Sequence, residues 1–413
     1  MPDRIHILVI SQYFYPEQFR VNDICTEWIK RGYQVTVITG IPNYPQGKFY
    51  NGYGYFQKRT ERYNGIDIIR LPIIPRGNSA VMMALNYISF VISGFLWSKF
   101  TTLKADKVFV YEVSPMTQAL PGIWYAKRVK IPCLIYVTDL WPENVEIVGG
   151  VHNRLILNML GAMVDYIYKS CNRIFTSSKS FLQAINHRGV PLEKLEFWPQ
   201  YAEEFYRPVD KKTCVVSEIP DDDSFNLIFA GNIGFAQGLD LLPQVAIELQ
   251  RQNTKVRFNI VGDGRYLPVL KEAVQASGCE SMFNFIHKQP AQRIAAFMSV
   301  CDAALISLSD NRIFEMTLPS KLQSLLACGI PLIVSANGEI QQVIEDSGAG
   351  YCCNAGDAVS LAEKIVELTR LPSEELKEMR KKARGYFMQH YEKRMLMDRI
   401  DKYFSEAEVV CNV

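Results

Sequence analysis

The stretch FNLIFAGNIGFAQG, Phe225–Gly238, joins a buried strand to a glycine-rich loop. Its first six residues are mostly apolar, as in a strand inside a sheet. Gly231 and Gly234 then alternate with the polar residues Asn232 and Gln237. Glycines let a ligand approach the backbone, and the helix expected next offers free N–H groups suited to a phosphate. A tight strand-to-helix turn without a ligand is the alternative, and the residues alone leave both open.

The same alternation of strand and helix runs in both directions from this stretch. Before it, we expect strands at 4–11, 34–40, 65–72, 107–112, 132–139, 173–178 and 194–201, and helices at 22–33, 77–98, 120–130 and 154–171. After it, we expect strands at 256–264, 282–288, 303–309, 330–335 and 350–355, and helices at 240–252, 266–277, 292–301, 322–329, 357–370 and 373–408. Apolar strands separated by helices indicate parallel sheets covered on both faces.

A polar, proline-containing segment, residues 205–224, separates two halves of similar size. We therefore predict an α/β protein with two doubly wound domains facing each other across a cleft. The predicted domains are residues 1–205 and 206–385, followed by a C-terminal helix at 386–413 that could cross back to the first domain.

Composition excludes several classes of protein. With 48% hydrophobic and 21% charged residues the chain is expected to be folded outside its termini, and its net charge of +2 gives no global nucleic-acid footprint. The ten cysteines include no CxxC pair, and MPDRIHILVIS runs directly into a strand without a secretory signal. Both observations predict a reduced cytoplasmic protein without structural zinc. A two-lobed solute-binding protein, which needs export, is thereby disfavoured.

One segment departs from the soluble pattern. Residues 77–98 carry no charge and lie between Arg76 and Lys99. Three interpretations stay open: a core helix of the first domain, a helix lying on a membrane at residues 79–98, and a true span. Trp97 beside Lys99 favours a membrane surface over a span. On that hypothesis, polar replacements at Phe90, Phe95 and Trp97 would release the protein from membranes.

The second half has further ligand candidates at its strand ends. The turn VGDGRY contains Gly262 and Asp263, and HKQP begins with His287 and Lys288. The segment DNRIFEMTLPSK then places Lys321 at the start of an apolar helix, where the helix dipole disfavours a cation. A negatively charged ligand near Lys321 would resolve that conflict, whereas a solvated lysine is the plain alternative. No GxGxxG follows either opening strand, which disfavours a redox dinucleotide.

In this order, GNIGFAQG, VGDG, HKQP and PSK leading into LLACGIPLIVS resemble the donor half of the family 4 retaining glycosyltransferases of GT-B fold. The first half, with ISQYFYPE, PNYPQG and TDLWPE, is similar to the branch that builds bacterial O-antigens, capsules and colanic acid, and most like its fucosamine transferases. The resemblance implies two Rossmann-like domains, with a nucleotide-sugar donor on the second and an acceptor on the first.

The resemblance also implies roles for individual residues. The donor residues it assigns are Gly231, Asn232, Gly234, Gln237, Gly262, Asp263, His287, Lys288, Arg312, Leu318, Pro319, Ser320 and Lys321. Positive groups there would stabilise the departing diphosphate as an oxocarbenium-like transition state forms, without a metal. No strand-end Asp-x-Asp is present, and Asp221–Asp223 lie in the linker.

The chain departs from the family pattern at two places. Gln237 stands where many members have a lysine, and Met316 and Ser324 stand where most have two glutamates, with Glu315 one place off. Lys321 and Arg312 are then expected to carry more of the phosphate binding, and Glu315 is kept as a catalytic candidate beside Lys321.

On the acceptor side, TDLWPE follows a strand, and its Asp139 is the candidate to assist the acceptor hydroxyl or the donor sugar. A loop cap is the alternative for Asp139. Further acceptor candidates are Glu17, Arg20, Trp141 and Glu143.

The resemblance implies transfer of a sugar, such as N-acetylfucosamine from a UDP-sugar, to a polyprenyl-diphosphate-linked saccharide. It implies no cofactor and no metal, and a peripheral position on the inner face of the bacterial plasma membrane. A nucleotide-sugar epimerase of the same two-domain plan and a non-catalytic sugar-nucleotide binding protein are the alternatives.

Overall fold

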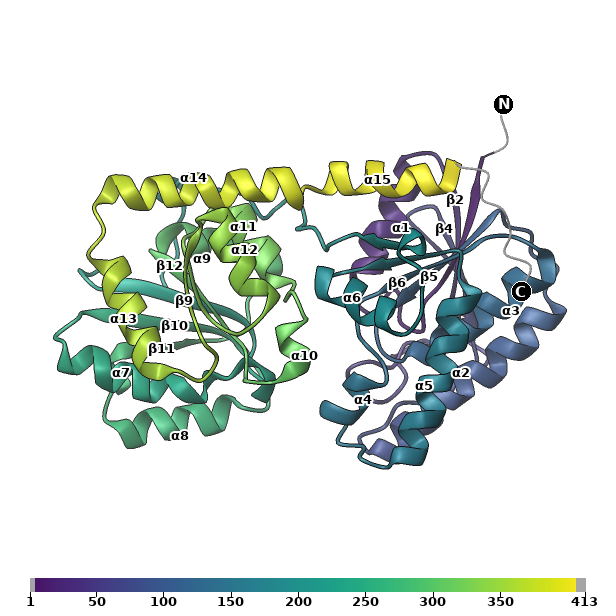
Figure 1. Cartoon of the computed structure of the whole chain (residues 1–413), viewed down its shortest axis with the longest axis horizontal. Helices are drawn as coiled ribbons and strands as arrows, with labels where there is room; N and C mark the ends of the chain where they lie inside the picture. Colours follow the sequence, from purple (N-terminus) through teal and green to yellow (C-terminus); the bar gives the residue numbers. More distant parts are fainter. Residues whose placement is uncertain (1–3, 406–413) are drawn as a thin grey trace. The chain divides into compact units, whose positions relative to one another are not determined.

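The computed structural model describes residues 4–405, which form two compact units (Figure 1). Of the described residues, unit 1 contains 4–177, Phe181–Trp198 and 400–405. Unit 2 contains Ser178–Ser180 and Pro199–Arg399. The boundaries between the two units lie at 198/199 and 399/400. The domain boundaries expected from the sequence are 205/206 and 385/386.

Unit 1 is built on an eight-stranded sheet with the order β3-β4-β2-β1-β5-β6-β7-β8. The strands are β1 (His6–Ile10), β2 (Gln34–Gly40), β3 (Thr60–Tyr63), β4 (Ile66–Leu71), β5 (Lys107–Glu112), β6 (Cys133–Val137), β7 (Arg173–Thr176) and β8 (Leu195–Phe197). All neighbours pair in parallel except the edge strand β3, which is antiparallel to β4. The order reverses between β1 and β5, where such sheets place their ligands at the carboxyl ends of the strands.

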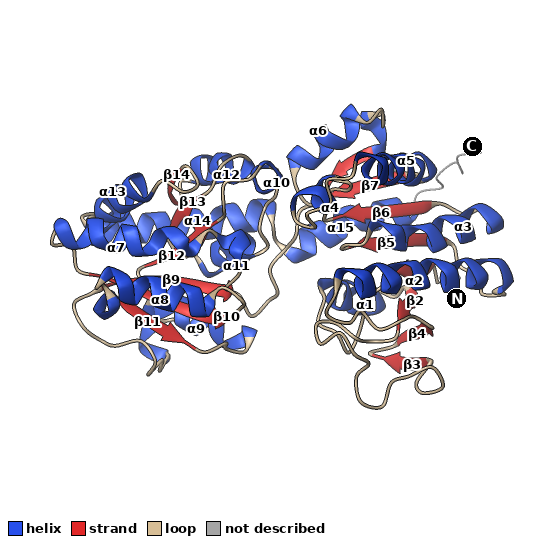
Figure 2. Cartoon of the chain, turned by 90° about the horizontal axis from the view of Figure 1, so that it is seen from below, coloured by secondary structure: helices blue, strands red, loops and turns tan. Residues whose placement is uncertain are grey.

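Helices cover both faces of this sheet (Figure 2). They are α1 (Arg20–Lys30), α2 (Ala80–Phe100), α3 (Ala119–Val129), α4 (Glu143–Ile147), α5 (Arg154–Ser170), α6 (Lys179–His187) and α15 (Lys393–Ser405). Side chains alternate along a strand, so β5 serves both faces. The side chains of Val108 and Val110 approach Gly122 of α3, whereas the ring of Phe109 packs edge-on against Trp28 of α1 and also contacts Phe404 of α15.

Helix α2 contacts the rest of unit 1 through a single line of buried residues, which we call the seam. Its buried residues, Asn86, Phe90, Gly94 and Ser98, recur every four positions and so form one line along the helix. A Cβ added at Gly94 would lie 2.3 Å from Cγ of Pro121 in α3, so the two helices meet at nearly backbone distance. Around this point Phe95 packs edge-on against Trp124, and Trp97 stacks on Tyr125.

We expect Gly94→Ala to destabilise unit 1 by about 1–3 kcal/mol, because the added methyl collides with the rigid ring of Pro121. Chemical denaturation followed by tryptophan fluorescence would measure the loss. Gly385→Ala, where a Cβ meets nothing within 4 Å, is the matched control and should not lower stability. Equal effects of the two substitutions would contradict the close approach.

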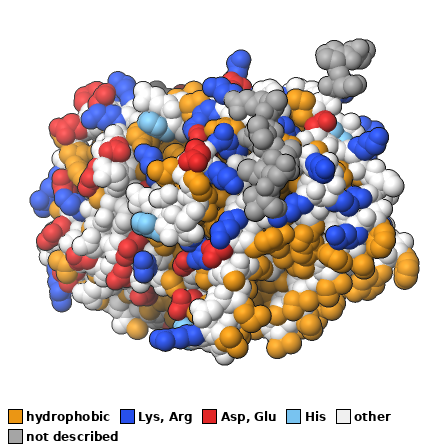
Figure 3. All heavy atoms as spheres, turned by 45° about the vertical axis from the view of Figure 1, so that its right-hand side comes forward, with side chains coloured by type: hydrophobic (Ala, Val, Ile, Leu, Met, Phe, Trp, Pro, Cys, Tyr) orange, Lys and Arg blue, Asp and Glu red, His pale blue; other side chains and the backbone are white. Residues whose placement is uncertain are grey.

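The other residues of α2 are partly or fully exposed, and apart from Lys99 the fully exposed side chains are apolar. Exposed residues of α2 and of the first half of α5 make up what we call the apolar face: Val81, Leu85, Ile88, Ile92, Phe95, Leu96, Phe100, Leu155, Ile156 and Met159. Figure 3 shows hydrophobic side chains gathered on this side of the molecule. Within residues 4–405, α2 alone is long and apolar enough to cross a membrane, by length and composition, with 17% of its most apolar window buried.

This exposure contradicts the core-helix interpretation of residues 77–98. It also corrects one expectation about individual residues, since Phe90 is fully buried while Phe95 is 42% exposed. The hydropathy of the segment is the same on all sides, so its sequence could not show which line of residues faces the sheet. A polar residue at Phe90 would damage folding, and a test of the surface has to avoid that position.

Unit 2 contains a six-stranded parallel sheet with the order β11-β10-β9-β12-β13-β14. Its strands are β9 (Phe225–Asn232), β10 (Val256–Asp263), β11 (Phe283–Ile286), β12 (Ala303–Ser307), β13 (Leu332–Ser335) and β14 (Gly350–Cys353). Counted from β9 this order is 3-2-1-4-5-6, that of a dinucleotide-binding sheet, with the reversal between β9 and β12. The opening stretch Phe225–Gly238 therefore lies at the predicted ligand end of the sheet.

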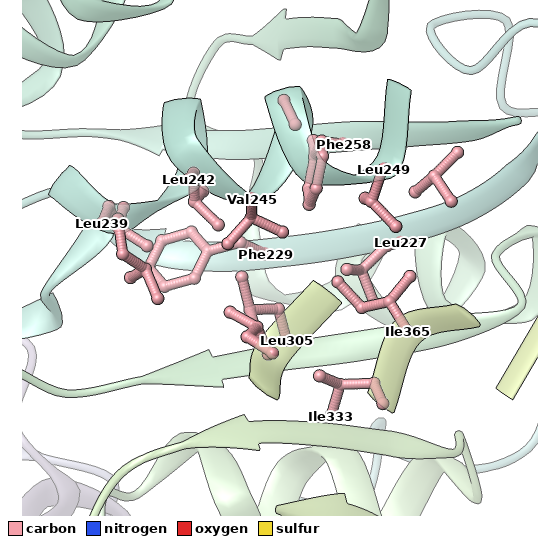
Figure 4. Packing of buried hydrophobic residues seen from close by; sticks show 14 of the residues in the cluster. Leu227, Phe229, Leu239, Leu242, Val245, Leu249, Phe258, Leu305, Ile333 and Ile365 are labelled. Carbon is pink, nitrogen blue, oxygen red and sulfur yellow. The ribbon is translucent and has the colours of Figure 1, made fainter. Parts of the chain in front are cut away.

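The helices of unit 2 are α7 (Leu242–Arg251), α8 (Leu267–Ser277), α9 (Ala291–Val300), α10 (Arg312–Glu315), α11 (Lys321–Cys328), α12 (Glu339–Ser347), α13 (Ala358–Thr369) and α14 (Ser373–His390). The core on one face of the sheet joins Leu227 and Phe229 of β9 to Leu242 and Val245 of α7 and Ile365 of α13 (Figure 4). This packing fixes β9, and with it the loop that follows, by burial of large apolar side chains.

Candidate functional site

The loop after β9 is held in shape by its own side chains. The amide of Gly234 donates to the side-chain oxygen of Gln237 at 3.2 Å, which closes a short turn at Phe235–Gln237. Gly238 has φ +53°, and a Cβ there would lie 2.9 Å from the amide of Ser309. The amide of Ser309 donates to the carbonyl of Ala236 at 3.1 Å, so the loops after β9 and β12 are joined. Gln237 is thus a structural residue of the loop.

Gly231 and Gly262 lie side by side at the ends of β9 and β10. Gly231 has φ +149° and Gly262 has φ +150°, and a Cβ on Gly262 would lie 1.9 Å from the carbonyl oxygen of Gly231. Gly262 is therefore needed for close packing of two backbones. Asp263 is exposed, and its carboxylate accepts from the amide of Gly264 at 2.8 Å.

Lys321 points its ammonium group at this pair of strands. Its Nζ lies 3.6 Å from the position of a Cβ on Gly231 and 4.2 Å from the ring centroid of Phe229. The Nζ atom is buried, and within residues 4–405 it has no hydrogen-bond partner. Burial lowers the pKa of Lys321 to about 8. Among the described residues the Phe229 ring alone stabilises this ammonium group, so its three N–H donors are available to an incoming anion.

The remaining donor candidates differ in where the structure places them. Leu318 is buried, and Pro319 accepts from the amide of Leu322 at 2.9 Å, so both shape the entry to α11. Ser320 and Arg312 are exposed. His287 and Lys288 are also exposed and follow the edge strand β11, two strands away from β9. The structure thus brings Gly231 and Lys321 together and leaves His287 and Lys288 at the edge of the sheet.

Glu315 is partly exposed at the end of α10, and its backbone supports a neighbouring turn. A Cβ on Gly338 would lie 2.1 Å from the carbonyl oxygen of Glu315. The next residue, Glu339, accepts from the amides of Lys179 at 2.8 Å and Ser180 at 2.7 Å. The sequence reasoning did not select Glu339. Its position could have indicated a structural role, because Glu339 follows Asn-Gly and is the first residue of a helix.

In unit 1, Asp139 lies in the loop after β6. Its carboxylate accepts from the amide of Ser114 at 3.0 Å, and the indole N–H of Trp141 donates to the hydroxyl of the same serine at 3.0 Å. Burial raises the pKa of Asp139, while the hydrogen bonds from Ser114 oppose that shift. Asp139 and Trp141 are thus fixed together by the loop after β5.

Glu112, the last residue of β5, is a functional candidate that the sequence reasoning missed. One oxygen of its fully buried carboxyl accepts from the amides of Thr138 at 3.3 Å and Asp139 at 3.2 Å. Burial raises the pKa of Glu112 well above its usual value, and the nearby Asp139 charge adds to this. Glu112 therefore positions the Asp139 loop. The sequence feature that could have indicated Glu112 is a glutamate at the end of the apolar strand KVFVYE.

Glu17 is buried and serves the backbone of the loop after β2. Its carboxylate accepts from the amides of Asn43 at 2.7 Å and Tyr44 at 2.6 Å. Burial raises the pKa of Glu17 to about 7, although these hydrogen bonds lower it. Glu17 thus holds the loop that carries Tyr44.

We expect Glu17→Gln to stabilise unit 1 increasingly as the pH rises. The raised pKa means that the folded protein resists ionisation between about pH 4.5 and about pH 7, so stability falls across this range. Glutamine keeps an acceptor oxygen and does not ionise. The variant should match the wild type near about pH 5 and exceed it by about 2 kcal/mol near about pH 8. Denaturant titrations at both pH values, with exposed Glu146→Gln as control, would measure this. A pH-independent difference would contradict it.

The other two acceptor candidates belong to the same edge of unit 1. Arg20 is the first residue of α1, and Glu143 is the first residue of α4, where it lies 4.0 Å from Arg188. Within residues 4–405, no group of three or more His, Cys, Asp or Glu side chains is arranged to hold a metal ion.

Comparison with known proteins decides the class of enzyme. Residues 211–386 match the family model described as "Glycosyl transferases group 1". The protein is a glycosyltransferase. The matched residues contain the Gly231, Gly262 and Lys321 arrangement and leave out Glu112 and Asp139.

Relatives and solved structures cover most of the glycosyltransferase chain. The probable glycosyltransferase WbjE of Pseudomonas aeruginosa is 24% identical over 72% of this chain and 75% of its own. The putative colanic acid biosynthesis glycosyl transferase WcaI of Escherichia coli is 24% identical over 89% and 92%. HepE of Anabaena, solved in complex with UDP and glucose, superposes with a TM-score of 0.69 at 13% identity over 98% and 100%. The predicted fold is confirmed: it is the GT-B fold, with two Rossmann-like units.

Proposed function

We propose that this glycosyltransferase moves a sugar from a UDP-sugar to a polyprenyl-diphosphate-linked saccharide during synthesis of a bacterial surface polysaccharide. The observation that carries the proposal is the buried ammonium group of Lys321, which lies beside Gly231 at the carboxyl end of β9 with no hydrogen-bond partner within residues 4–405. A diphosphate is the part of a nucleotide-sugar that would match such a group. The name of WcaI, a putative colanic acid biosynthesis glycosyl transferase, supports the polysaccharide pathway, and the UDP complex of HepE supports the nucleotide.

In the proposed reaction Lys321 acts on the leaving group. As the bond between sugar and diphosphate breaks, negative charge grows on the diphosphate, and an ammonium group already in place stabilises it without reorganisation. Gly231 has φ +149°, a backbone conformation that residues with a side chain rarely adopt, and without a Cβ it leaves the space in front of the Lys321 ammonium group to the phosphates. Retention of configuration and independence from metal belong to the same proposal and rest on the family resemblance.

Asp139 is the proposed group on the acceptor side. The Ser114 amide fixes one of its oxygens, and Glu112 fixes its backbone, so its position is defined before an acceptor binds. A carboxylate with a raised pKa can accept a proton from a hydroxyl group as that group attacks. Glu112 is a positioning residue in this scheme, since it acts through the Asp139 loop.

The apolar face is the proposed contact with the cytoplasmic side of the plasma membrane. Exposed basic side chains lie at one end of this face, at the carboxyl ends of α2 and α3: Lys99, Lys127, Arg128 and Lys130. The Arg128 side chain donates to the carbonyl of Thr101 at 2.7 Å, which brings the two helix ends together. Apolar side chains that enter a lipid surface, with cations beside them for anionic headgroups, are typical of peripheral membrane proteins.

A thermal-shift panel of nucleotides tests the proposed function. A ligand that binds the native state raises the melting temperature, so UDP should stabilise the protein and GDP or NAD should not. Analysis of a UDP-sugar incubated without acceptor separates the rival enzyme class, because an epimerase would convert the sugar and a transferase would not. Stabilisation by NAD alone would overturn the proposal.

A further inference from the structure

The guanidinium group of Arg76 lies among three tyrosine rings in unit 1. Arg76 comes between β4 and α2, and its Nη1 donates to the hydroxyl of Tyr13 at 3.0 Å. Its guanidinium carbon lies 5.3 Å from the ring centroid of Tyr44 and 6.0 Å from that of Tyr87. The group is only half-buried, and Tyr44 is 37% exposed, so a ligand can reach this cluster.

Among the described residues, Arg76 has no acid to balance its charge. No carboxylate within residues 4–405 lies at ion-pair distance from it, and the groups that raise its pKa are phenols, Tyr13, Tyr87 and Tyr44. Glu17 lies nearby, but its carboxylate is engaged by the amides of Asn43 and Tyr44. Partly buried arginines are normally paired with carboxylates or phosphates, whose geometry the guanidinium fork matches. The cluster therefore offers an anion site whose anion comes from outside the chain.

Contacts on both sides hold Arg76 in place. Its backbone amide donates to the side-chain oxygen of Asn43 at 2.9 Å, and its Nη2 lies 3.2 Å from the sulfur of Met83 in α2. Asp139 is close enough to the cluster to affect Tyr87 electrostatically, since its charge contributes to the raised pKa of Tyr87. Arg76 comes four residues before α2, the helix that carries most of the apolar face.

We propose that Arg76, with Tyr13, Tyr44 and Tyr87, binds the phosphate group of the acceptor's lipid carrier; this rests on the proposed function. The guanidinium and the phenol hydroxyls would donate to phosphate oxygens, and the aromatic rings would flank the first sugar. The carrier's apolar chain would then extend toward the apolar face, and its saccharide would point toward Asp139. The same chemistry, a phosphate on an apolar tail, is also that of a phospholipid headgroup, and the experiment separates the two.

The experiment measures binding of farnesyl diphosphate by calorimetry to full-length protein saturated with UDP, so that the donor's diphosphate site is filled. Arg76→Gln should weaken this binding by at least about tenfold, because one charge-assisted contact to phosphate is lost. Binding of farnesol should be weaker in the wild type and unchanged by the substitution. Arg62→Gln, on a side chain that is 73% exposed, is the matched control and should bind as the wild type does.

A second variant of Arg76, UDP binding and vesicle binding complete the experiment. Arg76→Lys keeps a charge and should bind with intermediate strength, which also tests the site if the glutamine variant folds poorly. UDP should stabilise every variant equally; if UDP fails to stabilise even the wild type, the proposed function has failed and not this subsite alone. Equal farnesyl diphosphate binding by Arg76→Gln and Arg62→Gln would overturn the inference. Loss of binding to phosphatidylglycerol vesicles without loss of farnesyl diphosphate binding would overturn it in favour of a headgroup site.

Discussion

Lys321→Met is expected to reduce sugar transfer by about a hundred- to thousandfold while the protein stays folded. The substitution removes the ammonium group beside Gly231 and keeps a side chain of similar length. Removing one preorganised donor from a charge that develops in the transition state has effects of this size. Steady-state kinetics with saturating UDP-sugar would show the loss mainly in kcat.

The same substitution is expected to stabilise the protein. A lysine whose folded pKa is lowered to about 8 resists protonation when folded, so the folded state is disfavoured at neutral pH. Stability should therefore rise in the wild type from about pH 8 to about pH 10.5. Lys321→Met should be more stable by about 2–3 kcal/mol near about pH 7, and the difference should vanish as the pH approaches about 10.5.

Lys381→Met, on a side chain that is 77% exposed, is the control for both effects. It should leave transfer and stability unchanged. Near-normal transfer by Lys321→Met would remove this lysine from the donor site. A loss of stability at neutral pH would mean that the ammonium group is better satisfied in the fold than its surroundings indicate.

Replacing Ile88, Ile92 and Met159 by serine is expected to release the protein from anionic vesicles. These side chains are 53%, 58% and 66% exposed, on α2 and α5, so the substitutions spare the seam that contains Phe90 and Gly94. Each lost apolar side chain weakens insertion by about 1 kcal/mol or more, and the three together should lower vesicle partition by about a hundredfold or more. Sedimentation with phosphatidylglycerol vesicles would measure this.

Two substitutions of exposed valines in unit 2 serve as controls for the vesicle experiment. Val269→Ser and Val359→Ser alter residues that are 44% and 53% exposed and that lie outside the apolar face, so they should leave partition unchanged. Vesicles without anionic lipid should bind the wild type more weakly, since the cations at the ends of α2 and α3 lose their partners. The membrane hypothesis would be wrong if the triple variant still sedimented like the wild type.

Much of the fold could be predicted because its strands are short apolar runs that end in turn residues. The strand of Phe225–Asn232 and its glycine loop are local features, and the parallel order follows once helices separate the strands. The position of Lys321 was also predictable in part, because a lysine at a helix start conflicts with the dipole and invites an anion.

What the sequence could not provide is pairing between distant segments. Glu112 binds the amides of Thr138 and Asp139, 26 and 27 residues later, and only the order of β5 and β6 brings them together. In the sequence, Arg76 is only a charged residue that flanks an apolar segment. The structure shows that Tyr13 and Tyr87 lie around its guanidinium group. The part of the apolar face on α5 was missed because Leu155, Ile156 and Met159 resemble core residues of an amphipathic helix.

The central claim is that the donor's diphosphate meets the ammonium group of Lys321, and proton uptake on UDP binding tests it most directly. Near about pH 8.5 the free lysine is mostly neutral, and a bound diphosphate should raise its pKa, so UDP should bind with uptake of up to about 0.8 proton. Calorimetry in buffers of different ionisation enthalpy measures this number. Near about pH 8.5 the terminal phosphate of UDP is fully ionised, so we predict uptake there for the wild type and none for Lys321→Met. UDP binding with equal proton uptake by the wild type and Lys321→Met would contradict the claim.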